Sequence, residues 1–307
     1  MTCCSVDAKL ETFCSAQANW ESANSTCPTT TVFDTPVWQK AWWDHFGTGK
    51  EQRIISVNRD DGQMELLAPM MYSDGTVSFL GGTDLVDYHN FVYSDRATDE
   101  CIEAVLRELS SDRSVNRILL ESVVDRDLLE RATNIAESLS WRIEIEQEDV
   151  SPRMELPGSW DEYLAGLRKK DRHELRRKMR RLEGAGDVRH VELSSREDIE
   201  AAADDFFQLH RQSTPDKNEF MTAEREMFFR DVAGRLADVG VTRLAFLELD
   251  GEKVRPWHIG PVKALILALA LPICYGVWFF IKHKKLNFFS FVGLISVLLT
   301  GGLTLYL

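Results

Sequence analysis

Three consecutive residues that can carry out proton chemistry follow a double-glycine turn. Gly81-Gly82 precedes Asp87, Tyr88 and His89 in a segment without helical or strand periodicity. Asp, Tyr and His side chains can act as an acid, a base or a hydrogen-bond donor during group transfer. The same segment also fits an ordinary loop in which Asp87 caps the next element. Both interpretations stay open at this level.

A second candidate for catalysis is His210, near the end of a predicted helix over Arg196–Gln212. A histidine at that position can instead favour the negative end of the helix dipole. The six cysteines contain no C-x-x-C pair, and no histidine follows one at zinc-finger spacing. We therefore predict no metal site.

A basic run marks the start of the second half of the chain. Residues Arg168–Arg181 hold nine basic and two acidic side chains. Apolar residues recur at helical spacing through it, which predicts one long helix over Trp160–Leu182 with its charges facing solvent. The run could bind nucleic acid, contact an anionic membrane or phosphate, or be a solvated face.

The charge balance separates the chain into two parts. Residues 254–307 hold five of the 36 basic residues and no acid, which leaves 31 basic and 49 acidic residues in 1–253, a formal charge of −18. The acidic charge of this part argues against nucleic acid as a main partner. The length of 307 residues suggests about two domains. A charged fraction of 28% with 44% hydrophobic residues excludes a wholly disordered or collagen-like chain.

The two ends of the chain are predicted to differ from the middle. Residues 1–31 are rich in Ser, Thr, Ala, Asn and Cys and lack a basic stretch followed by an apolar core, so we expect a flexible tail with reduced cysteines and no secretory signal. Residues 264–281 and 288–307 are charge-free. Since a helix crosses a bilayer with about 20 apolar residues, 255–307 is predicted to be a two-helix transmembrane hairpin, with 264–307 in the lipid bilayer.

The basic loop 282–287 should face the cytoplasm by the positive-inside rule, which conflicts with a cytoplasmic 1–253 joined to the same hairpin. We nevertheless expect membrane localisation of the hairpin, with the soluble part in the cytoplasm.

The periodicity of residues 32–254 predicts two units of similar order. The first, 32–150, reads α, β, β, β, α, β, α, β, with a hairpin at Asp61-Gly62. The predicted elements are Thr35–Phe46, Arg53–Asn58, Met64–Met71, Thr76–Leu80, Ala97–Leu109, Arg117–Glu121, Asp127–Leu139 and Trp141–Glu146. The second, 151–254, continues with a strand at Arg189–Leu193, helices at Arg196–Gln212 and Ala223–Val239 and a strand at Val241–Leu249. It is incomplete, because Asp250-Gly251 starts a second hairpin that has no continuation before the hydrophobic segment.

Several motifs in residues 33–254 together resemble the CelD-like (cellulose biosynthesis) acyltransferases of the GNAT superfamily, which are related to the tandem-unit Fem-type aminoacyl transferases. The motifs are T-P-x-W-x-x-x-W-W-x-x-F-G at Thr35–Gly47, D-Y-H-N-F at Asp87–Phe91, M-E-L-P-G-S-W-D-E-Y-L at Met154–Leu164, K-K-D-R-H-E-L-R-R-K at Lys169–Lys178, F-F-R-D-V-A-G-R-L at Phe228–Leu236 and L-A-F-L-E-L-D-G-E at Leu244–Glu252. The resemblance implies an α/β (α+β) fold of tandem GNAT-like units, here with the second truncated.

The resemblance also implies a reaction: transfer of an acyl group from acyl-CoA to an amine or hydroxyl of a small-molecule or glycan acceptor, in exopolysaccharide or cell-envelope biosynthesis. The candidate residues are Asp87, Tyr88, His89 and His210 for catalysis and Arg172 and Arg176 for substrate binding. GNAT enzymes hold the CoA pyrophosphate on backbone N–H groups at a helix N-terminus after a Gly-rich turn. Gly81-Gly82 lacks the Q/R-x-x-G-x-G/A pattern, so we assign no CoA site, and we expect truncation to impair activity.

Residues 255–307 resemble something else. G-P-V at Gly260–Val262, K-H-K-K-L-N-F-F-S in the basic loop and the following G-L-I-S-V-L-L-T-G-G are similar to small bacterial membrane proteins related to intracellular septation protein A. Two alternatives to the enzyme therefore stay open. The chain is a non-catalytic membrane protein with a soluble binding module, or two unrelated genes are accidentally fused near Val254–Arg255.

Overall fold

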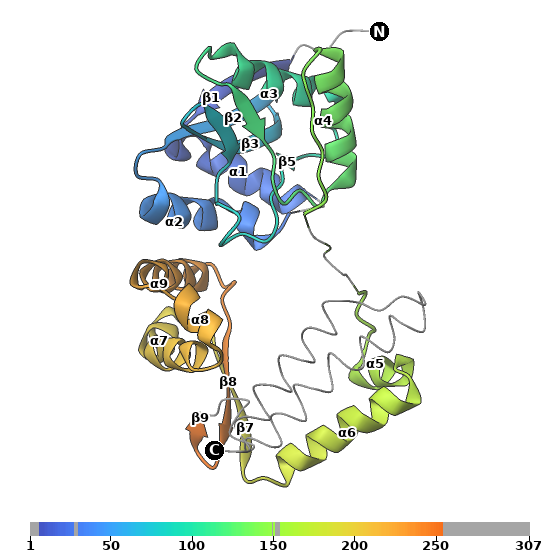
Figure 1. Cartoon of the computed structure of the whole chain (residues 1–307), viewed down its shortest axis with the longest axis vertical. Coiled ribbons are helices and arrows are strands. Elements are labelled where there is room, and N and C mark those ends of the chain that lie inside the picture. Colours follow the sequence, from blue (N-terminus) through green and yellow to red (C-terminus); the bar gives the residue numbers. More distant parts are fainter. Residues whose placement is uncertain (1–5, 28–29, 149, 151–153, 254–307) are drawn as a thin grey trace. The chain divides into compact units, whose positions relative to one another are not determined.

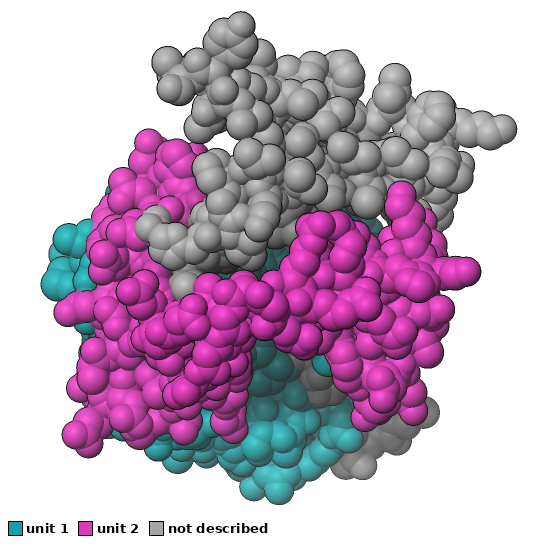
Figure 2. Space-filling view, turned by 90° about the horizontal axis from the view of Figure 1, so that it is seen from below, with its two compact units in different colours: residues 1–157, 223–242 teal, residues 158–222, 243–307 magenta. Residues whose placement is uncertain are grey.

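The computed structural model describes residues 6–27, 30–148, 150 and 154–253. The chain has a mixed α/β fold (Figure 1) and divides into two compact units, each built from two stretches of sequence (Figure 2). Unit 1 comprises residues 1–157 and 223–242, and unit 2 comprises residues 158–222 and 243–307. This division differs from the predicted domains 32–150 and 151–254, because a late helix joins the first unit.

Unit 1 is a sheet with helices packed against it. Its elements are β1 (Val6–Glu11), α1 (Phe13–Thr26), the 3-10 helix η1 (Val32–Asp34), α2 (Pro36–Phe46), β2 (Glu51–Arg59), β3 (Met64–Ser73), β4 (Thr76–Phe79), β5 (Val92–Tyr93), α3 (Asp99–Ser111), β6 (Arg117–Leu119), α4 (Arg126–Ser138) and α9 (Ala223–Asp238).

The strands of unit 1 follow the order β1-β2-β3-β4-β6, with β5 paired to β3 beside this path. The pairs from β1 to β4 are antiparallel, whereas β4 and β6 are parallel. The β2–β3 hairpin turns at Asp61-Gly62, as the sequence predicted, and Gly62 has a φ of 78° that suits glycine. A parallel pair at the end of an antiparallel sheet places the carboxyl ends of β4 and β6 side by side.

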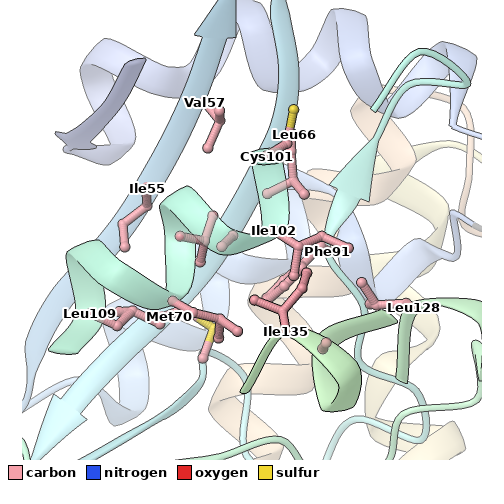
Figure 3. Packing of buried hydrophobic residues seen from close by; sticks show 14 of the residues in the cluster. Ile55, Val57, Leu66, Met70, Phe91, Cys101, Ile102, Leu109, Leu128 and Ile135 are labelled. Atoms are coloured by element: carbon pink, nitrogen blue, oxygen red, sulfur yellow. The ribbon is translucent and has the colours of Figure 1, made fainter. Parts of the chain in front are cut away.

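One face of this sheet carries the main hydrophobic core (Figure 3). Side chains of β2 and β3 alternate toward it, and α3 and α4 cover it with residues at helical spacing. The cluster includes Ile55, Val57, Leu66, Met70, Phe91, Cys101, Ile102, Leu109, Leu128 and Ile135. A close-packed core of this kind fixes the two parallel strands and the loops that follow them.

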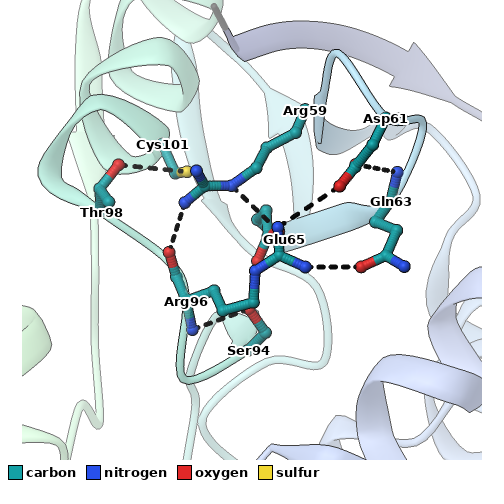
Figure 4. A network of polar contacts seen from close by, with 8 residues as sticks. All are labelled: Arg59, Asp61, Gln63, Glu65, Ser94, Arg96, Thr98 and Cys101. Atoms are coloured by element: carbon teal, nitrogen blue, oxygen red, sulfur yellow. Dashed lines mark hydrogen bonds and ion pairs between the residues drawn. The ribbon is translucent and has the colours of Figure 1, made fainter. Parts of the chain in front are cut away.

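A buried carboxylate fastens the β2–β3 hairpin to the segment before α3 (Figure 4). Glu65 on β3 is 2% exposed, and its Oε1 lies 3.1 Å from Arg59 Nε and 3.2 Å from an Arg96 guanidinium nitrogen. Ser94 Oγ donates to its other oxygen. Because a buried charge is tolerated only when it is paired and hydrogen-bonded, the network has to form together with the hairpin.

Helix α2 begins as its sequence predicts. Thr35 is the N-cap, its Oγ1 accepts from the backbone N of Trp38 at 3.3 Å, and Pro36 occupies the first turn. Trp38 and Trp42 are buried on the same face. The aromatic stripe formed by Trp38, Trp42 and Phe46 is therefore a packing surface.

Helix α9 supplies the partner for that stripe. Phe228 is fully buried, and its ring centroid lies 5.6 Å from Trp38 and 5.3 Å from Phe46. Polar contacts flank the rings: His45 Nε2 lies 3.1 Å from Asp231 Oδ2, and an Arg235 nitrogen lies 3.0 Å from an Asp44 oxygen. A helix encoded after residue 222 thus completes the unit that starts at the N-terminus.

Among the described residues, unit 2 is smaller than unit 1 and buries fewer side chains. Its elements are α5 (Trp160–Gly166), α6 (Lys169–Glu183), β7 (Val188–Leu193), α7 (Arg196–Arg211), α8 (Pro215–Phe220), β8 (Leu244–Leu249) and β9 (Glu252–Lys253). The strands form an antiparallel sheet in the order β7-β8-β9. Ile199 and Phe207 on α7 and Phe246 on β8 are buried, whereas α6 buries no residue.

The N-terminal segment differs from the expected flexible tail over 1–31. Residues 6–11 form β1, which pairs along its whole length with β2, and residues 13–26 form α1. Trp20 on α1 is fully buried, and its Nε1 donates to the backbone oxygen of Asp34 at 2.8 Å. The polar composition of this segment did not predict these elements, because only a few apolar residues anchor them.

Two further predictions of elements are corrected. Residues 141–146, predicted as a strand, form no strand. The single helix predicted over Trp160–Leu182 is two helices, because Leu167 is extended with a ψ of 147°. Arg172 stabilises the break: its Nη1 donates to the carbonyl oxygens of Leu164 and Ala165 at 3.4 and 3.3 Å.

The hydrophobic C-terminal stretches lie outside the described residues. Residues 264–281 and 288–307, predicted to form the transmembrane hairpin, and the junction at Val254–Arg255 are among them. Within the described part of the chain, no helix is both long and apolar enough to span a bilayer.

Candidate functional site

The candidate site lies where the parallel strands of unit 1 end. Gly81 and Gly82 follow β4, and Glu121 and Ser122 follow β6. In sheets with parallel strands, ligands bind beyond the carboxyl ends, where the connecting loops can open a crevice. The segment 87–89, which the sequence singled out, lies against this edge, because His89 forms a parallel bridge with Val123.

Glycine is required at the turn that leads into the site. Gly81 has a φ of 130° and Gly82 a φ of 66°. A Cβ atom on Gly81 would lie 3.0 Å from Val86 and 3.1 Å from His89 Nε2. Both the backbone conformation and the close approach therefore exclude a side chain at Gly81.

His89 is held firmly in the interior of unit 1. It is 3% exposed, its ring stacks on Phe79 with a centroid distance of 5.2 Å, and its backbone N donates to Ser122 O at 3.1 Å. Nδ1 lies 3.2 Å from Glu121 O. Since a carbonyl only accepts, Nδ1 carries the proton and Nε2 presents a lone pair.

Burial makes His89 neutral. Desolvation lowers its pKa to about 4, despite the opposing effect of the hydrogen bond to Glu121. Nε2 is buried and has no hydrogen-bond partner among the described residues. His89 therefore places an uncharged acceptor atom in the interior of unit 1, next to the Gly81 turn.

From His89 back to Asp87, the side chains lie progressively closer to the surface. Asp87 is exposed, whereas Tyr88 is partly buried with its ring edge toward Phe33, at a centroid distance of 6.1 Å. The three predicted residues thus share one segment and pass from solvent to interior. The arrangement suits a segment that contacts a ligand at the surface and is anchored by His89.

Asp125 anchors the far end of the same segment. Its Oδ1 caps α4 by accepting from Leu128 N at 3.1 Å, and its Oδ2 accepts from Asn90 Nδ2 at 3.4 Å and from the Tyr93 hydroxyl. Burial alone would raise the pKa of Asp125, but these hydrogen bonds outweigh it and keep the pKa below its usual value.

Ser122 opposite has a φ of 56°, an uncommon conformation for a residue other than glycine. It is held in place because its backbone N donates to Glu148 at 2.9 Å.

Helix α2 contributes buried polar atoms that sequence reasoning missed. Gln39 Nε2 donates to Phe33 O at 2.8 Å, while Gln39 Oε1 and the indole nitrogens of Trp38 and Trp42 have no partner among the described residues. Gln39 and Trp42 approach the Gly81 and Gly82 positions respectively. No pattern in the sequence indicated Gln39, because it is a single polar residue among the aromatic positions of α2.

Asp34, just before α2, was also missed. It is buried, and desolvation raises its pKa to about 6 although its Oδ2 accepts from Thr31 N at 2.7 Å and from Thr31 Oγ1 at 2.8 Å. The spacing of Thr31 and Asp34 is a capping box, which could have revealed the contact but not the burial.

The other predicted site residues belong to unit 2. His210 lies near the end of α7, where burial, aided by the charges of Lys217 and Arg211, lowers its pKa, and its Nδ1 has no partner among the described residues. Arg172 is committed to the carbonyls of α5, whereas Arg176 is exposed on α6. Arg176 is thus the guanidinium of this pair that is available to a ligand.

The described residues offer little to a metal ion or to a CoA pyrophosphate. No group of three or more His, Cys, Asp or Glu side chains among them could hold a metal ion. Gly81-Gly82 leads into β5 and not directly into a helix, so it does not offer the helix N-terminus that a CoA pyrophosphate requires. The equivalent residues of the second unit follow β9, outside the described residues.

Comparison with known proteins defines the class of fold. A family model described as an acetyltransferase (GNAT) domain matches residues 169–259, so the chain contains a GNAT acetyltransferase-like domain. Among solved structures, the crystal structure of FemX is similar to it, with a TM-score of 0.53 and 16% sequence identity over 96% of this chain and 70% of that chain. This similarity shows the fold alone. The search of curated proteins gave no match. The CelD-like and septation-protein resemblances stay predictions.

Proposed function

We propose that the chain is a GNAT-type acyltransferase that transfers an acyl group from acyl-CoA to an amine or hydroxyl of a small-molecule or glycan acceptor. The observation that supports this most is the acetyltransferase-domain match over 169–259, in a chain whose fold resembles FemX. The setting in exopolysaccharide or cell-envelope biosynthesis and the anchoring through 264–307, with the rest of the chain in the cytoplasm, belong to the same proposal.

The proposed reaction is a direct transfer. The acceptor's nitrogen or oxygen attacks the thioester carbonyl carbon, the C–S bond breaks, CoA leaves as its thiol, and the acceptor loses one proton. His89 is neutral at physiological pH, but a pKa near 4 makes it a weak base. Its proposed role is to position the segment of residues 87–89. The exposed carboxylate of Asp87 takes the acceptor's proton and passes it to the departing CoA thiolate, and Tyr88 contacts the acceptor.

Unit 2 is proposed to bind the phosphate groups of acyl-CoA through its own exposed cations. Acyl-CoA carries phosphate groups, and a guanidinium binds phosphate with paired hydrogen bonds. Arg176 is exposed and suits that role, whereas Arg172 already donates to α5 carbonyls. His210, neutral because burial lowers its pKa, is proposed as a second hydrogen-bonding group.

The experiment uses the full chain and two readouts. Acetyl-CoA binding is measured by calorimetry, and free CoA is quantified by mass spectrometry with amino sugars and polysaccharides as acceptors. Saturable binding and acceptor-dependent CoA release are expected. His89→Gln should lower kcat/KM by about 10²-fold or more while leaving acetyl-CoA binding intact. The exposed His190 on β7 gives the matched control, His190→Gln, which should change neither. No binding of any acyl-CoA would rule out the enzyme.

A second candidate function is a non-catalytic binding module. It is favoured by the absence, among the described residues, of a Gly-rich turn of the CoA-binding pattern after β4. In that case the site of unit 1 binds the acceptor-type ligand by itself. Calorimetry distinguishes the two functions, because the module gives heat with the sugar and none with acetyl-CoA.

A further inference from the structure

Helix α6 presents a cationic stripe to solvent. Lys169, His173, Arg176 and Arg180 are all exposed and fall at positions i, i+4, i+7 and i+11. Because a helix turns 100° per residue, these positions share one face, and the stripe is about 16 Å long at 1.5 Å per residue. Lys170 and Arg181 are also exposed and flank it.

The cations of this stripe differ from those on the rest of the helix. Arg177 and Lys178 lie within 4.0 Å of Glu174, and Arg168 pairs with Asp171. By contrast, within the described residues no acidic side chain lies within 4.0 Å of Lys169, Lys170, Arg176, Arg180 or Arg181, although the charge of Arg181 also acts on Glu174. These charges repel one another when left alone, so an external anion that meets several of them together is favoured.

Apolar and aromatic groups accompany the charges. Trp160 on α5 is 51% exposed and stacks on Tyr163 at a centroid distance of 5.3 Å, and Met179 on α6 is 39% exposed. The two helices are joined through the hydrogen bonds of Arg172 to the α5 carbonyls. Trp and Tyr side chains are favoured at membrane–water interfaces, where one end is apolar and the other is hydrated.

We propose that the exposed face of α6, together with the Trp160–Tyr163 pair on the adjoining helix α5, docks onto a bilayer surface of anionic phospholipids. A row of Lys and Arg on a helix is attracted to anionic headgroups, and the aromatic pair suits the interface.

The chain also leads from this unit toward its hydrophobic stretches. Strand β9 of unit 2 ends at Lys253, and ten residues separate it from the charge-free stretch that starts at residue 264. Ten extended residues reach no more than about 35 Å. If residues 264–281 enter a bilayer as predicted, unit 2 stays within that distance of its surface.

The test measures how the full chain partitions between vesicles. Phosphatidylcholine vesicles are compared with vesicles that contain 30% phosphatidylglycerol, and bound protein is quantified after sedimentation. The variant is Lys169→Gln/Arg180→Gln/Arg181→Gln, which leaves Arg176 available for the proposed acyl-CoA contact. Each Lys or Arg near an anionic surface contributes about fivefold to the partition coefficient, so the variant should lose about a hundredfold of the preference for anionic vesicles. About 0.5 M salt should suppress the preference of the unmodified chain.

The matched control removes the same charge elsewhere. Arg113→Gln/Arg117→Gln/Arg126→Gln alters three exposed arginines of unit 1 and should preserve the anionic preference. Circular dichroism checks that both variants are folded. Equal losses in the two triple variants would overturn the proposal, as would a chain that partitions equally into both vesicle types. Stripe-dependent binding to a 20-nucleotide RNA without anionic-vesicle preference would also overturn it, in favour of nucleic acid.

Discussion

The two units place their charges and apolar groups in opposite ways. Among the described residues, the largest fully buried side chains, including Trp20, Phe91 and Phe228, all lie in unit 1, which even buries the carboxylate Glu65 within an ion-paired network. In unit 2, helix α6 buries no residue, and its cations face outward. The difference shows that similar helices and strands can serve either as a core or as a surface, depending on what covers them.

The core of unit 1 is completed by a helix from late in the chain. Its aromatic face on α2 is covered by α9, which follows α8 of unit 2 in the chain. Amphipathic helices gain most of their stability from such packing. The packing of α9 on α2 is therefore expected to contribute strongly to the stability of unit 1.

The largest expected effect follows from Phe228→Ala. Removing a fully buried Phe that contacts Trp38 and Phe46 should cost about 3–5 kcal/mol. Hydrogen exchange should accelerate in peptides from α2 and β2, and not in β7. Met227→Ala, at a neighbouring position that is 56% exposed, should have almost no effect. Acceleration confined to β7 would assign α9 to unit 2 instead.

The next effect is on the pH dependence of the stability of unit 1, where two buried groups act in opposite directions. Burial raises the pKa of Asp34 to about 6, so its contribution to stability is present below about pH 4 and is lost as pH rises toward 6. Burial lowers the pKa of His89 to about 4, so its contribution is present above about pH 6.5 and is lost as pH falls toward 4. The two shifts amount to about 3 kcal/mol each and oppose one another.

Single substitutions should separate the two groups. Asp34→Asn should leave a chain whose stability falls as pH drops from 6.5 to 4, whereas His89→Gln should leave one whose stability falls as pH rises from 4 to 6. Urea unfolding monitored by tryptophan fluorescence measures this, because five of the eight tryptophans belong to unit 1. Parallel pH profiles of the two variants would contradict the assignment.

A medium effect distinguishes buried from exposed ion pairs. Glu65→Gln leaves Arg59 and Arg96 without their buried counter-charge and should cost about 2 kcal/mol. Glu192→Gln in unit 2 removes a partner of Arg243 whose own side chain is 66% exposed, and should cost less than about 0.5 kcal/mol. Urea midpoints of the two variants give the comparison, which fails if both costs are equal.

The smallest effect should be the same in both units. Thr35→Ala removes the N-cap of α2, and Ser195→Ala removes that of α7, where Ser195 Oγ accepts from Asp198 N at 3.1 Å. Each should cost about 1 kcal/mol, since a cap is a local contact. The conservative variants Thr35→Ser and Ser195→Thr keep a capping hydroxyl, so they should retain most of the stability in the same unfolding assay.

Local signals predicted much of the fold. The Thr35-Pro36 start of α2, the Asp61-Gly62 turn and the apolar period of α3 and α4 each depend on neighbouring residues, and the structure has these elements close to the predicted bounds. The strand pair β7–β8 was found for the same reason.

What was missed depends on distant partners. β1 is a strand because β2 lies beside it, and the break before α6 depends on Arg172 reaching back to α5. Residue types alone singled out the segment of Asp87, Tyr88 and His89 as a candidate, but they did not predict its burial gradient. Likewise the buried Asp34 and Gln39 are ordinary polar residues until the chain folds around them.

The division of unit 1 into two stretches has a consequence for synthesis on the ribosome. After residue 157 has been made, residues 158–242 must follow before α9 can cover the aromatic face of α2. At about 5–20 residues per second, that interval is roughly 4 to 17 s. During this time Trp38, Trp42 and Phe46 are exposed on the nascent chain, which gives chaperones a defined segment to bind.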